Sequence, residues 1–227
     1  MSIAENLRLV KERIKTACEK VNRNPDEIKL VAVSKNKPVE MIVAAIQAGI
    51  TCFGENRVQE AQAKIPQINA SVEWHLVGNL QTNKVKKALE LFHIIESVDS
   101  LHLALEIQRR CEQQNKNIPI LIEVNTSGEP TKHGVQPEGL FDLIEEVLKL
   151  PRLQLQGLMT IGPGLAVEEP EASRACFQLL ARLRSEAQDR FGIALPHLSM
   201  GMSSDFIIGI EEGATIIRIG TALFGPR

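Results

Sequence analysis

The sequence contains no tyrosine and a single tryptophan, and aromatic side chains make up only 4% of its 227 residues. The absence of tyrosine excludes a phenol as the acid or base of any reaction carried out by this chain alone. Cysteine is also sparse: the four thiols, Cys18, Cys52, Cys111 and Cys176, have neither C-x-x-C spacing nor histidines at the intervals of a zinc site. We therefore expect reduced, packed cysteines and no metal site.

An excess of charge of either sign is lacking as well. The 26 basic and 28 acidic residues give a formal net charge of −2, so no overall field attracts nucleic acid or an anionic membrane. No apolar run is long enough to span a bilayer, and residues 1–5 lack the basic and apolar regions that begin a signal peptide. These absences predict a cytoplasmic protein that binds neither nucleic acid nor membranes.

Short apolar runs do occur, and they alternate with amphipathic segments along the chain. We expect strands at residues 29–34, 51–54, 73–77, 93–98, 118–124, 153–161, 196–200 and 215–219. Helices are expected between them, at residues 38–48, 56–65, 82–91, 100–115, 137–150, 170–191 and 205–211. Eight short strands separated by helical crossovers favour a closed parallel barrel over an open doubly wound sheet. The predicted fold is α/β, a single (β/α)8 TIM barrel domain over residues 1–227.

Residues 2–23 have the pattern of an amphipathic helix, because Ser2 and Glu5 have capping-box spacing and apolar residues then recur every three or four positions. This stripe could form a dimer seam, but it lasts only about three heptads and lacks a systematic flanking charge code. Because the chain stops soon after the eighth strand, we expect this helix to close the ring of a monomer. The long connections at 125–136 and 162–169 both follow strands and are candidate lids.

A lysine stands at the end of the first expected strand. On a pleated strand Val31, Val33 and Lys35 share one face, so the amine emerges beside apolar side chains. Such surroundings lower the pKa of a lysine and supply the neutral amine that Schiff-base chemistry with a carbonyl requires. The alternative is that Lys35 packs only its stem and keeps a hydrated ammonium.

The loops after the seventh and eighth strands offer groups that suit a phosphate. The first contains Ser203 and Ser204, and the second contains Gly220 and Thr221. In (β/α)8 enzymes a phosphate site is frequently built from these two loops. Each piece also has an ordinary explanation, with a serine as helix cap, Gly220 as a turn residue and Arg218 as an ion-pair partner. Together with the lysine of the first strand, they predict a pocket for a phosphorylated aldehyde.

Three further stretches face the same rim of the predicted barrel. Asn56 either caps a helix or bonds a ligand, and His75 is either a core histidine or a site residue. The lysine run that begins at Lys84 is more typical of a solvated face than of a binding patch. Lys132 and His133 lie in a long loop, where surface exposure is expected.

Six motifs together resemble a known family. They are VAVSK at 31–35, GENRVQE at 54–60, HLVGNLQTNK at 75–84, GLMTIGP at 157–163, SMGMSSDF at 199–206 and IRIGTALFG at 217–225. In this order they closely resemble the pyridoxal phosphate homeostasis protein family, and the resemblance spans nearly the entire chain. Members of that family are similar to the barrel domain of alanine racemase-type enzymes, which is fold type III of the pyridoxal phosphate enzymes.

The resemblance implies a cofactor, pyridoxal 5′-phosphate, and a role for each matched residue. Lys35 is implied to form a reversible aldimine with the cofactor aldehyde, and Arg218 matches the arginine that faces the pyridine nitrogen in the racemase barrel. The implied phosphate ligands are Ser203 or Ser204, Gly220 and Thr221, and the implied pocket lining is Asn56, Met159 and His197.

The resemblance does not imply enzymatic activity, for two reasons. Racemase-type enzymes add a β-domain and use a tyrosine from a partner subunit, and this chain has neither that domain nor any tyrosine. An arginine at the ring nitrogen also discourages protonation of the ring and weakens it as an electron sink. We therefore expect a non-enzymatic protein of vitamin B6 and amino- or keto-acid homeostasis.

Other functions stay open at this point. A pyridoxal phosphate-dependent racemase or decarboxylase needs an acid–base residue near Lys35, for which His197 and Lys132 are candidates. A class I aldolase also uses a Schiff-base lysine, but usually one from a later strand. Transfer of the cofactor to acceptor apoenzymes, and an adaptor role in which the ligand signals to a protein partner, are further alternatives.

Overall fold

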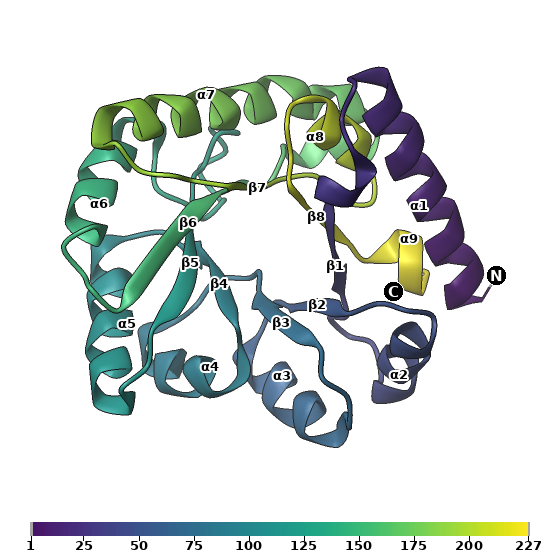
Figure 1. Cartoon of the computed structure of the whole chain (residues 1–227), viewed down its shortest axis with the longest axis horizontal. Coiled ribbons are helices and arrows are strands. Elements are labelled where there is room, and N and C mark those ends of the chain that lie inside the picture. The colour runs from purple at the N-terminus through teal and green to yellow at the C-terminus, as the bar shows by residue number, and fades with distance from the viewer. Residues whose placement is uncertain (1, 227) are drawn as a thin grey trace.

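The computed structural model describes residues 2–226, which form a closed barrel of eight parallel strands surrounded by helices (Figure 1). The strands are β1 (Lys29–Val33), β2 (Cys52–Glu55), β3 (Glu73–Leu76), β4 (Ile94–Val98), β5 (Ile118–Glu123), β6 (Leu153–Met159), β7 (His197–Ser199) and β8 (Ile216–Ile219). Each strand pairs with the next along the chain, and β8 pairs with β1. The predicted barrel is confirmed, and the ends of each predicted strand lie within two residues of the observed ones.

The helices are α1 (Ile3–Lys20), α2 (Val39–Gln47), α3 (Val58–Lys64), α4 (Val85–Leu91), α5 (Leu101–Gln114), α6 (Leu140–Val147), α7 (Arg174–Phe191), α8 (Phe206–Glu211) and α9 (Thr221–Phe224). Three predicted helices start with a separate 3₁₀ turn, at Thr82–Lys84, Pro137–Gly139 and Pro170–Ser173. Such turns are frequent at helix N-termini, and two of these begin with proline, whose ring fixes φ for the first turn. The short α9 was not predicted.

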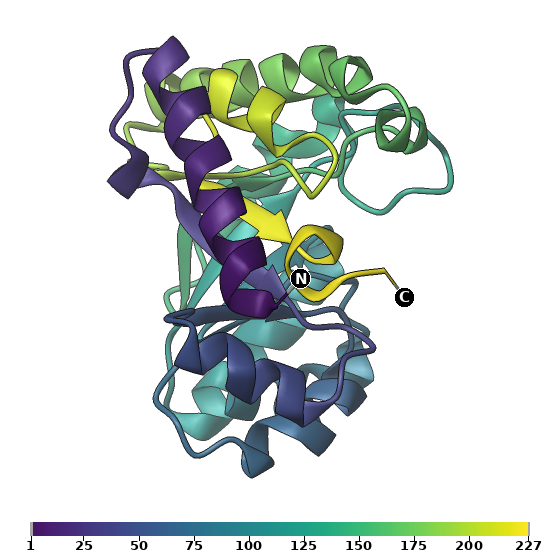
Figure 2. The same cartoon turned by 90° about the vertical axis from the view of Figure 1, so that its right-hand side faces the viewer.

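The first helix begins with the capping box expected from the sequence. The Glu5 N–H donates to Ser2 Oγ at 3.2 Å, and the Ser2 N–H donates to Glu5 Oε2 at 3.0 Å. Its buried face packs on α8 and α9, and the Asn6 amide donates to the Leu223 carbonyl at 2.8 Å. Figures 1 and 2 show α1 lying across the gap between α8 and α2, beside the yellow C-terminal segment.

The buried apolar side chains of the strands divide between two hydrophobic clusters. A large cluster fills the space between strands and helices, whereas a small one fills the inside of the barrel. On β1, Ala32 belongs to the outer cluster and Val31 and Val33 to the inner one. The four cysteines are buried and free, as predicted. No helix within residues 2–226 is both long and apolar enough to cross a bilayer.

Candidate functional site

Lys35 lies in a tight turn directly after β1. The Lys37 N–H donates to the Ser34 carbonyl at 3.0 Å and closes the turn, in which Asn36 adopts a positive φ of 58°. Asparagine tolerates this left-handed conformation better than most residues. Lys35 is half-buried, two positions beyond the inward-facing Val33, which is the placement expected from the strand pattern.

A buried ammonium group holds the near end of this turn. Lys64 Nζ on α3 donates to the Ser34 carbonyl at 2.8 Å and to Glu55 Oε1 at 3.0 Å, and the Lys64 side chain is only 10% exposed. Glu55 is fully buried and also accepts a hydrogen bond from the Ser34 hydroxyl at 2.7 Å. Burial raises the pKa of Glu55, while the bonds to Ser34 and Lys64 act in the opposite direction.

The far end of the turn is held by Glu60, which lies one helical turn before Lys64. Glu60 Oε1 accepts both the Asn36 N–H and the ammonium of Lys64, each at 2.5 Å. The residues on both sides of Lys35 are therefore bonded to one cluster, formed by Glu55, Glu60 and Lys64. The sequence analysis did not identify this cluster, although the i,i+4 spacing of Glu60 and Lys64 was a signal for their pairing.

Arg218 on β8 lies inside the barrel and is 4% exposed. Its guanidinium donates to Ser199 Oγ at 2.5 Å and to the Thr160 carbonyl at 2.7 Å. The Ser199 hydroxyl in turn donates to Glu96 Oε2 at 2.5 Å, and this oxygen is 4.0 Å from the guanidinium. Arg218 is thus the ion-pair partner that one interpretation of the sequence expected, and its contacts come from β4, β7 and the residue that follows β6.

A chain of charged groups continues from Glu96 to the amino ends of the strands. His75 Nδ1 forms a short hydrogen bond with Glu96, and Nε2 lies 3.1 Å from Glu73 Oε1, though not aligned as a hydrogen bond. Burial alone would lower the pKa of His75, but Cys52, Glu73 and Glu96 together raise it to about 11. His75 is therefore a core histidine whose carboxylate neighbours favour its protonated form.

This chain also brings together three possible metal ligands that the sequence analysis did not connect. One ligand atom each of Cys52, Glu73 and His75 lies within 4.8 Å of the others. Both Glu73 oxygens accept hydrogen bonds from Lys29 Nζ, at 2.9 and 3.2 Å. The grouping is invisible in the sequence because its members come from adjacent strands, β2 and β3. Its present contacts are those of an ion-pair network that runs from the buried His75 to the half-buried Glu73 and Lys29.

The loops after β7 and β8 meet, as the phosphate-site hypothesis requires. Ser203 Oγ accepts hydrogen bonds from the Gly220 N–H at 3.3 Å and from the Ala222 N–H at 3.2 Å. Two backbone N–H groups of the β8 loop therefore converge on one oxygen of the β7 loop. Thr221 is exposed and Ser204 half-buried beside them. No serine side chain caps α8, because its N-cap residue is Asp205.

Asp205 holds the β7 loop in shape. Its two carboxylate oxygens accept hydrogen bonds from the Met202 N–H at 2.7 Å and from the Ser173 hydroxyl at 2.6 Å. Gly201 adopts a φ of 96°, a conformation that side chains rarely take. The loop that carries Ser203 is therefore fixed by its own contacts.

Three other residues singled out from the sequence lie at different depths. Met159 is fully buried in the inner cluster, and Asn56 is half-buried after β2. The prediction that Asn56 caps α3 was wrong. The N-cap residue of α3 is Arg57, and no side chain forms a capping hydrogen bond there. His197 begins β7 at the amino end of the strand, and its buried Nδ1 lacks a hydrogen-bond partner within the described chain. Burial lowers the pKa of His197.

A buried carboxyl group near these residues was missed. Glu123 ends β5 opposite Met159 on β6 and is 4% exposed. The pKa of Glu123 is raised to about 7, chiefly by burial. The charge of Arg218 lowers this pKa, and the charge of Asp99 raises it. A carboxyl group with this pKa changes charge near neutrality. The only signal in the sequence was an acidic residue at the end of an apolar strand.

The two loops predicted as lids are bonded to each other. Lys132 Nζ forms a short hydrogen bond with the Gly162 carbonyl and lies 3.4 Å from Glu129 Oε1. The same glutamate oxygen accepts the Gly164 N–H at 2.8 Å. Lys132 is half-buried rather than exposed, because its side chain spans the two loops.

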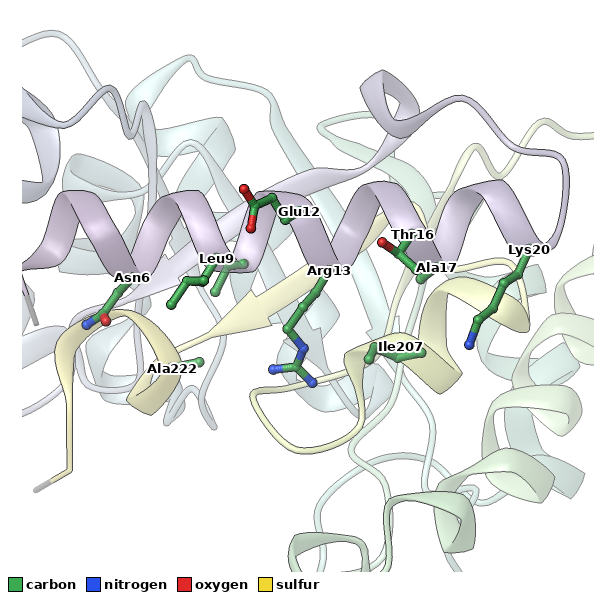
Figure 3. Close-up of a pocket in the computed structure, with 10 residues that line it drawn as sticks. Asn6, Leu9, Glu12, Arg13, Thr16, Ala17, Lys20, Ile207 and Ala222 are labelled. Atoms are coloured by element: carbon green, nitrogen blue, oxygen red, sulfur yellow. The ribbon is translucent and has the colours of Figure 1, made fainter.

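Two pockets lie on different sides of the barrel. One, of about 620 Å³, lies among loops at the carboxyl ends of β2, β3 and β5, where the barrel opens. Another, of about 420 Å³, is a groove outside the ring, where α1 crosses α8 and α9 (Figure 3). Arg13 and Ile207 flank this groove, and the Arg13 guanidinium lies 4.6 Å from the centre of the Phe206 ring.

Comparison with known proteins agrees with this geometry. The chain matches the alanine racemase N-terminal domain family over residues 3–227. It is 49% identical to the pyridoxal phosphate homeostasis protein of Aquifex aeolicus, with 100% of this chain and 99% of that protein covered, and 42% identical to that of Vibrio cholerae, with 100% and 97% covered.

Solved structures extend the comparison. PipY of Synechococcus elongatus with pyridoxal phosphate bound superposes with a TM-score of 0.85 at 37% identity, covering 99% of this chain and 100% of that one. Alanine racemase of Clostridium difficile gives a TM-score of 0.79 at 17% identity, covering 98% of this chain and 57% of that one, which shows a shared fold alone. The chain therefore belongs to the pyridoxal phosphate homeostasis protein family, and its barrel is of the alanine racemase N-terminal domain type.

Proposed function

We propose that this protein binds pyridoxal 5′-phosphate at the barrel mouth and holds it reversibly through an aldimine to Lys35. The observation that carries the proposal is the position of the half-buried Lys35 in a hydrogen-bonded turn at the end of β1. This turn is next to the loops after β7 and β8, which are bonded to each other. Strand β1 neighbours β8 in the barrel, so an aldehyde and a phosphate on one small molecule suit these two anchors. The PLP-bound PipY structure gives independent support.

The phosphate is assigned to Ser203, Ser204, Gly220 and Thr221. The convergence of two backbone N–H groups on the Ser203 hydroxyl supports this assignment, because such groups bind oxyanions as well as hydroxyl oxygens. We place Asn56 and Met159 in the lining of the pocket. The position of His197 at the amino end of β7 offers no support for its contact with the cofactor.

We further propose that the protein stores or delivers the cofactor and does not turn over a substrate. When bound, the cofactor supplies an electrophilic aldehyde that exchanges between amines. Arg218 keeps its charge, since burial lowers its pKa from a very high ordinary value while Glu96, Glu123 and Asp205 oppose that change. This charged arginine is shared with the racemase barrel that the motifs resemble, so the missing tyrosine is the feature that weighs against turnover. The names of the relatives describe homeostasis rather than catalysis.

The visible spectrum of the purified protein tests the proposed binding. Wild-type protein loaded with pyridoxal phosphate is expected to show an aldimine band that borohydride removes. Lys35→Ala is expected to lack the band while keeping weaker, non-covalent binding through the phosphate loops. A band of unchanged position and intensity in Lys35→Ala would overturn the assignment of Lys35.

Glu123 is the one observation that favours a second function, that of a pyridoxal phosphate-dependent enzyme acting on an amino acid. Its carboxyl group lies inside the barrel with a pKa of about 7, which suits a general acid or base. The missing tyrosine weighs against this function. Proton exchange at the α-carbon of amino acids distinguishes the two proposals.

We also propose a cytoplasmic monomer that exchanges its cofactor with acceptor apoenzymes. The packing of the apolar face of α1 onto α8 and α9 supports a monomer, because this face is already buried within the chain. Light scattering checks the molar mass. Transfer is checked by following activation of an apoenzyme by the loaded protein.

A further inference from the structure

The pocket of about 620 Å³ at the carboxyl ends of β2, β3 and β5, here called the rim pocket, shares Asn56 with the proposed lining of the cofactor site, and the proposed function uses none of its other residues. Its lining residues come from three loops and the starts of two helices, and are Asn56, Arg57, Val58, Gln59, Gly78, Asn79, Gln81, Lys84 and His133. Three of these side chains are basic and four are amides, and none of the nine residues carries a carboxylate.

This composition is unusual for a protein with a formal charge of −2. Arg57 and Lys84 bring two positive charges to one concave surface, and Lys84 is half-buried there. An acidic residue, Asp99, lies beside the lining, where its Oδ2 accepts a hydrogen bond from the Asn79 amide at 3.3 Å. The rim pocket therefore favours an anion.

Contacts between the loops preform the rim pocket. A Cβ atom on Gly78 would lie 2.4 Å from the Asn56 carbonyl oxygen, so the loops after β2 and β3 are in direct backbone contact. The Asn79 amide lies 3.3 Å from His133 Nδ1 and links the β5 loop to them. The Lys84 N–H donates to the Gln81 carbonyl at 2.9 Å, which fixes the third part of the wall. A preformed site loses less entropy when it binds a ligand.

We propose that the rim pocket binds a short-chain dicarboxylate. An arginine binds a carboxylate bidentately and a lysine binds one as a point charge, so the two cations suit two separate carboxylates. The amides of Gln59, Asn79 and Gln81 supply both donors and acceptors for the rest of such a molecule. The volume exceeds what a single carboxylate or phosphate group needs.

This site is separate from the one assigned to the phosphate of the cofactor. The phosphate loops follow β7 and β8, whereas the rim pocket is built after β2, β3 and β5. Asn56 is common to both linings, but Arg57 and Lys84, on which the inference rests, have no part in the proposed function. If Lys35 forms no aldimine, the dicarboxylate site is still tested separately by the titration described below.

Calorimetric titration of the pyridoxal phosphate-loaded protein with succinate, at low ionic strength, tests the proposal. Succinate is expected to bind, and acetate and inorganic phosphate to bind at least tenfold more weakly. The double variant Arg57→Gln/Lys84→Gln is expected to weaken succinate binding by about tenfold or more, since two charge-assisted hydrogen-bonding groups are lost. Lys86→Gln, which removes an exposed lysine from α4 outside the pocket, is the matched control and should bind succinate as the wild type does.

Two further variants keep the result unambiguous. Asn79→Asp adds a negative charge to the pocket at almost constant size and is expected to weaken succinate binding while leaving the circular dichroism spectrum unchanged. Lys35→Ala is expected to bind succinate normally. Absence of succinate binding to the wild type, equal affinity for inorganic phosphate, or full affinity in the Arg57/Lys84 double variant would each overturn the proposal.

Discussion

At the scale of single residues, Lys64 has the largest part in shaping the Lys35 turn. Its ammonium bonds to the Ser34 carbonyl and to both Glu55 and Glu60, within 2.5–3.0 Å. Removing one partner from a buried ion pair leaves the charge of the other partner uncompensated, in a medium that solvates charge poorly. Two carboxylates therefore depend on this one lysine.

We predict that Lys64→Met destabilises the protein by about 3–5 kcal/mol, because it leaves the buried Glu55 and the half-buried Glu60 without their cation. Urea unfolding followed by circular dichroism measures the change. The control is Lys87→Met, which breaks an exposed pair with Glu90 and should change the free energy of unfolding by less than about 1 kcal/mol. Equal effects of the two variants would contradict the role given to Lys64.

A second prediction at this scale concerns pH. The pKa of His75 is raised from 6.5 to about 11 in the folded protein, so the folded state binds more protons than the unfolded state between these values. The stabilisation is fully present below about pH 6.5 and is lost as the pH rises towards 11. The free energy of unfolding should therefore fall between pH 7 and pH 10.

His75→Gln removes the titrating group and should flatten this slope. Denaturant unfolding of both proteins at several pH values provides the measurement. The variant is also expected to be less stable at pH 7, since Glu73 and Glu96 lose a cationic partner. Parallel pH profiles for the wild type and His75→Gln would show that His75 is not charged in the folded state.

At the scale of elements, the loops after β7 and β8 act as a unit held by Ser203. The prediction is that pyridoxal, which lacks the phosphate, binds much more weakly than pyridoxal phosphate. Each lost charge-assisted hydrogen bond contributes roughly 1.5–3 kcal/mol, so several of them change the affinity by orders of magnitude. Competition for the aldimine band gives both affinities, and similar values would mean that these loops do not hold the phosphate.

The strands and the start of the first helix could be predicted from the sequence, whereas contacts between elements could not. The strands were found because apolar, β-branched runs and their flanking turn residues are local signals, and the Ser2 capping box is equally local. The cluster of Glu55, Glu60 and Lys64 was not found, because it depends on which helix covers which strand end. The ends of helices were the least accurate, since 3₁₀ and α turns share nearly the same sequence preferences.

The interior of the barrel was even less accessible to sequence reasoning. Arg218, Ser199 and Glu96 meet across three strands that are far apart in the chain. Their meeting depends on barrel closure and on the register of each strand pair. The positions of Lys35, Ser203 and Gly220 could be predicted because carboxyl ends of parallel strands lie on one face of a barrel.

At the scale of the whole molecule, the proposed carrier role requires amine exchange at Lys35 and none of the tyrosine chemistry of the racemase-type enzymes, and the chain contains no tyrosine. We predict that the loaded protein, incubated with L-alanine in deuterated water, exchanges the α-proton no faster than free pyridoxal phosphate does. Proton NMR measures the rate. Faster exchange that is lost in both Lys35→Ala and Glu123→Gln would establish the enzymatic alternative, with Glu123 as its acid–base group.

The most direct test of the account is to locate the covalent link. Protein loaded with pyridoxal phosphate is reduced with borohydride, digested and mapped by mass spectrometry. Lys37→Ala is the matched control, because the neighbouring Lys37 ammonium instead bonds to the carbonyls of Phe224, Gly225 and Pro226. The account predicts a reduced adduct on the peptide that contains Lys35, in the wild type and in Lys37→Ala. An adduct confined to Lys37 or Lys84, or one that persists in full in Lys35→Ala, would contradict it.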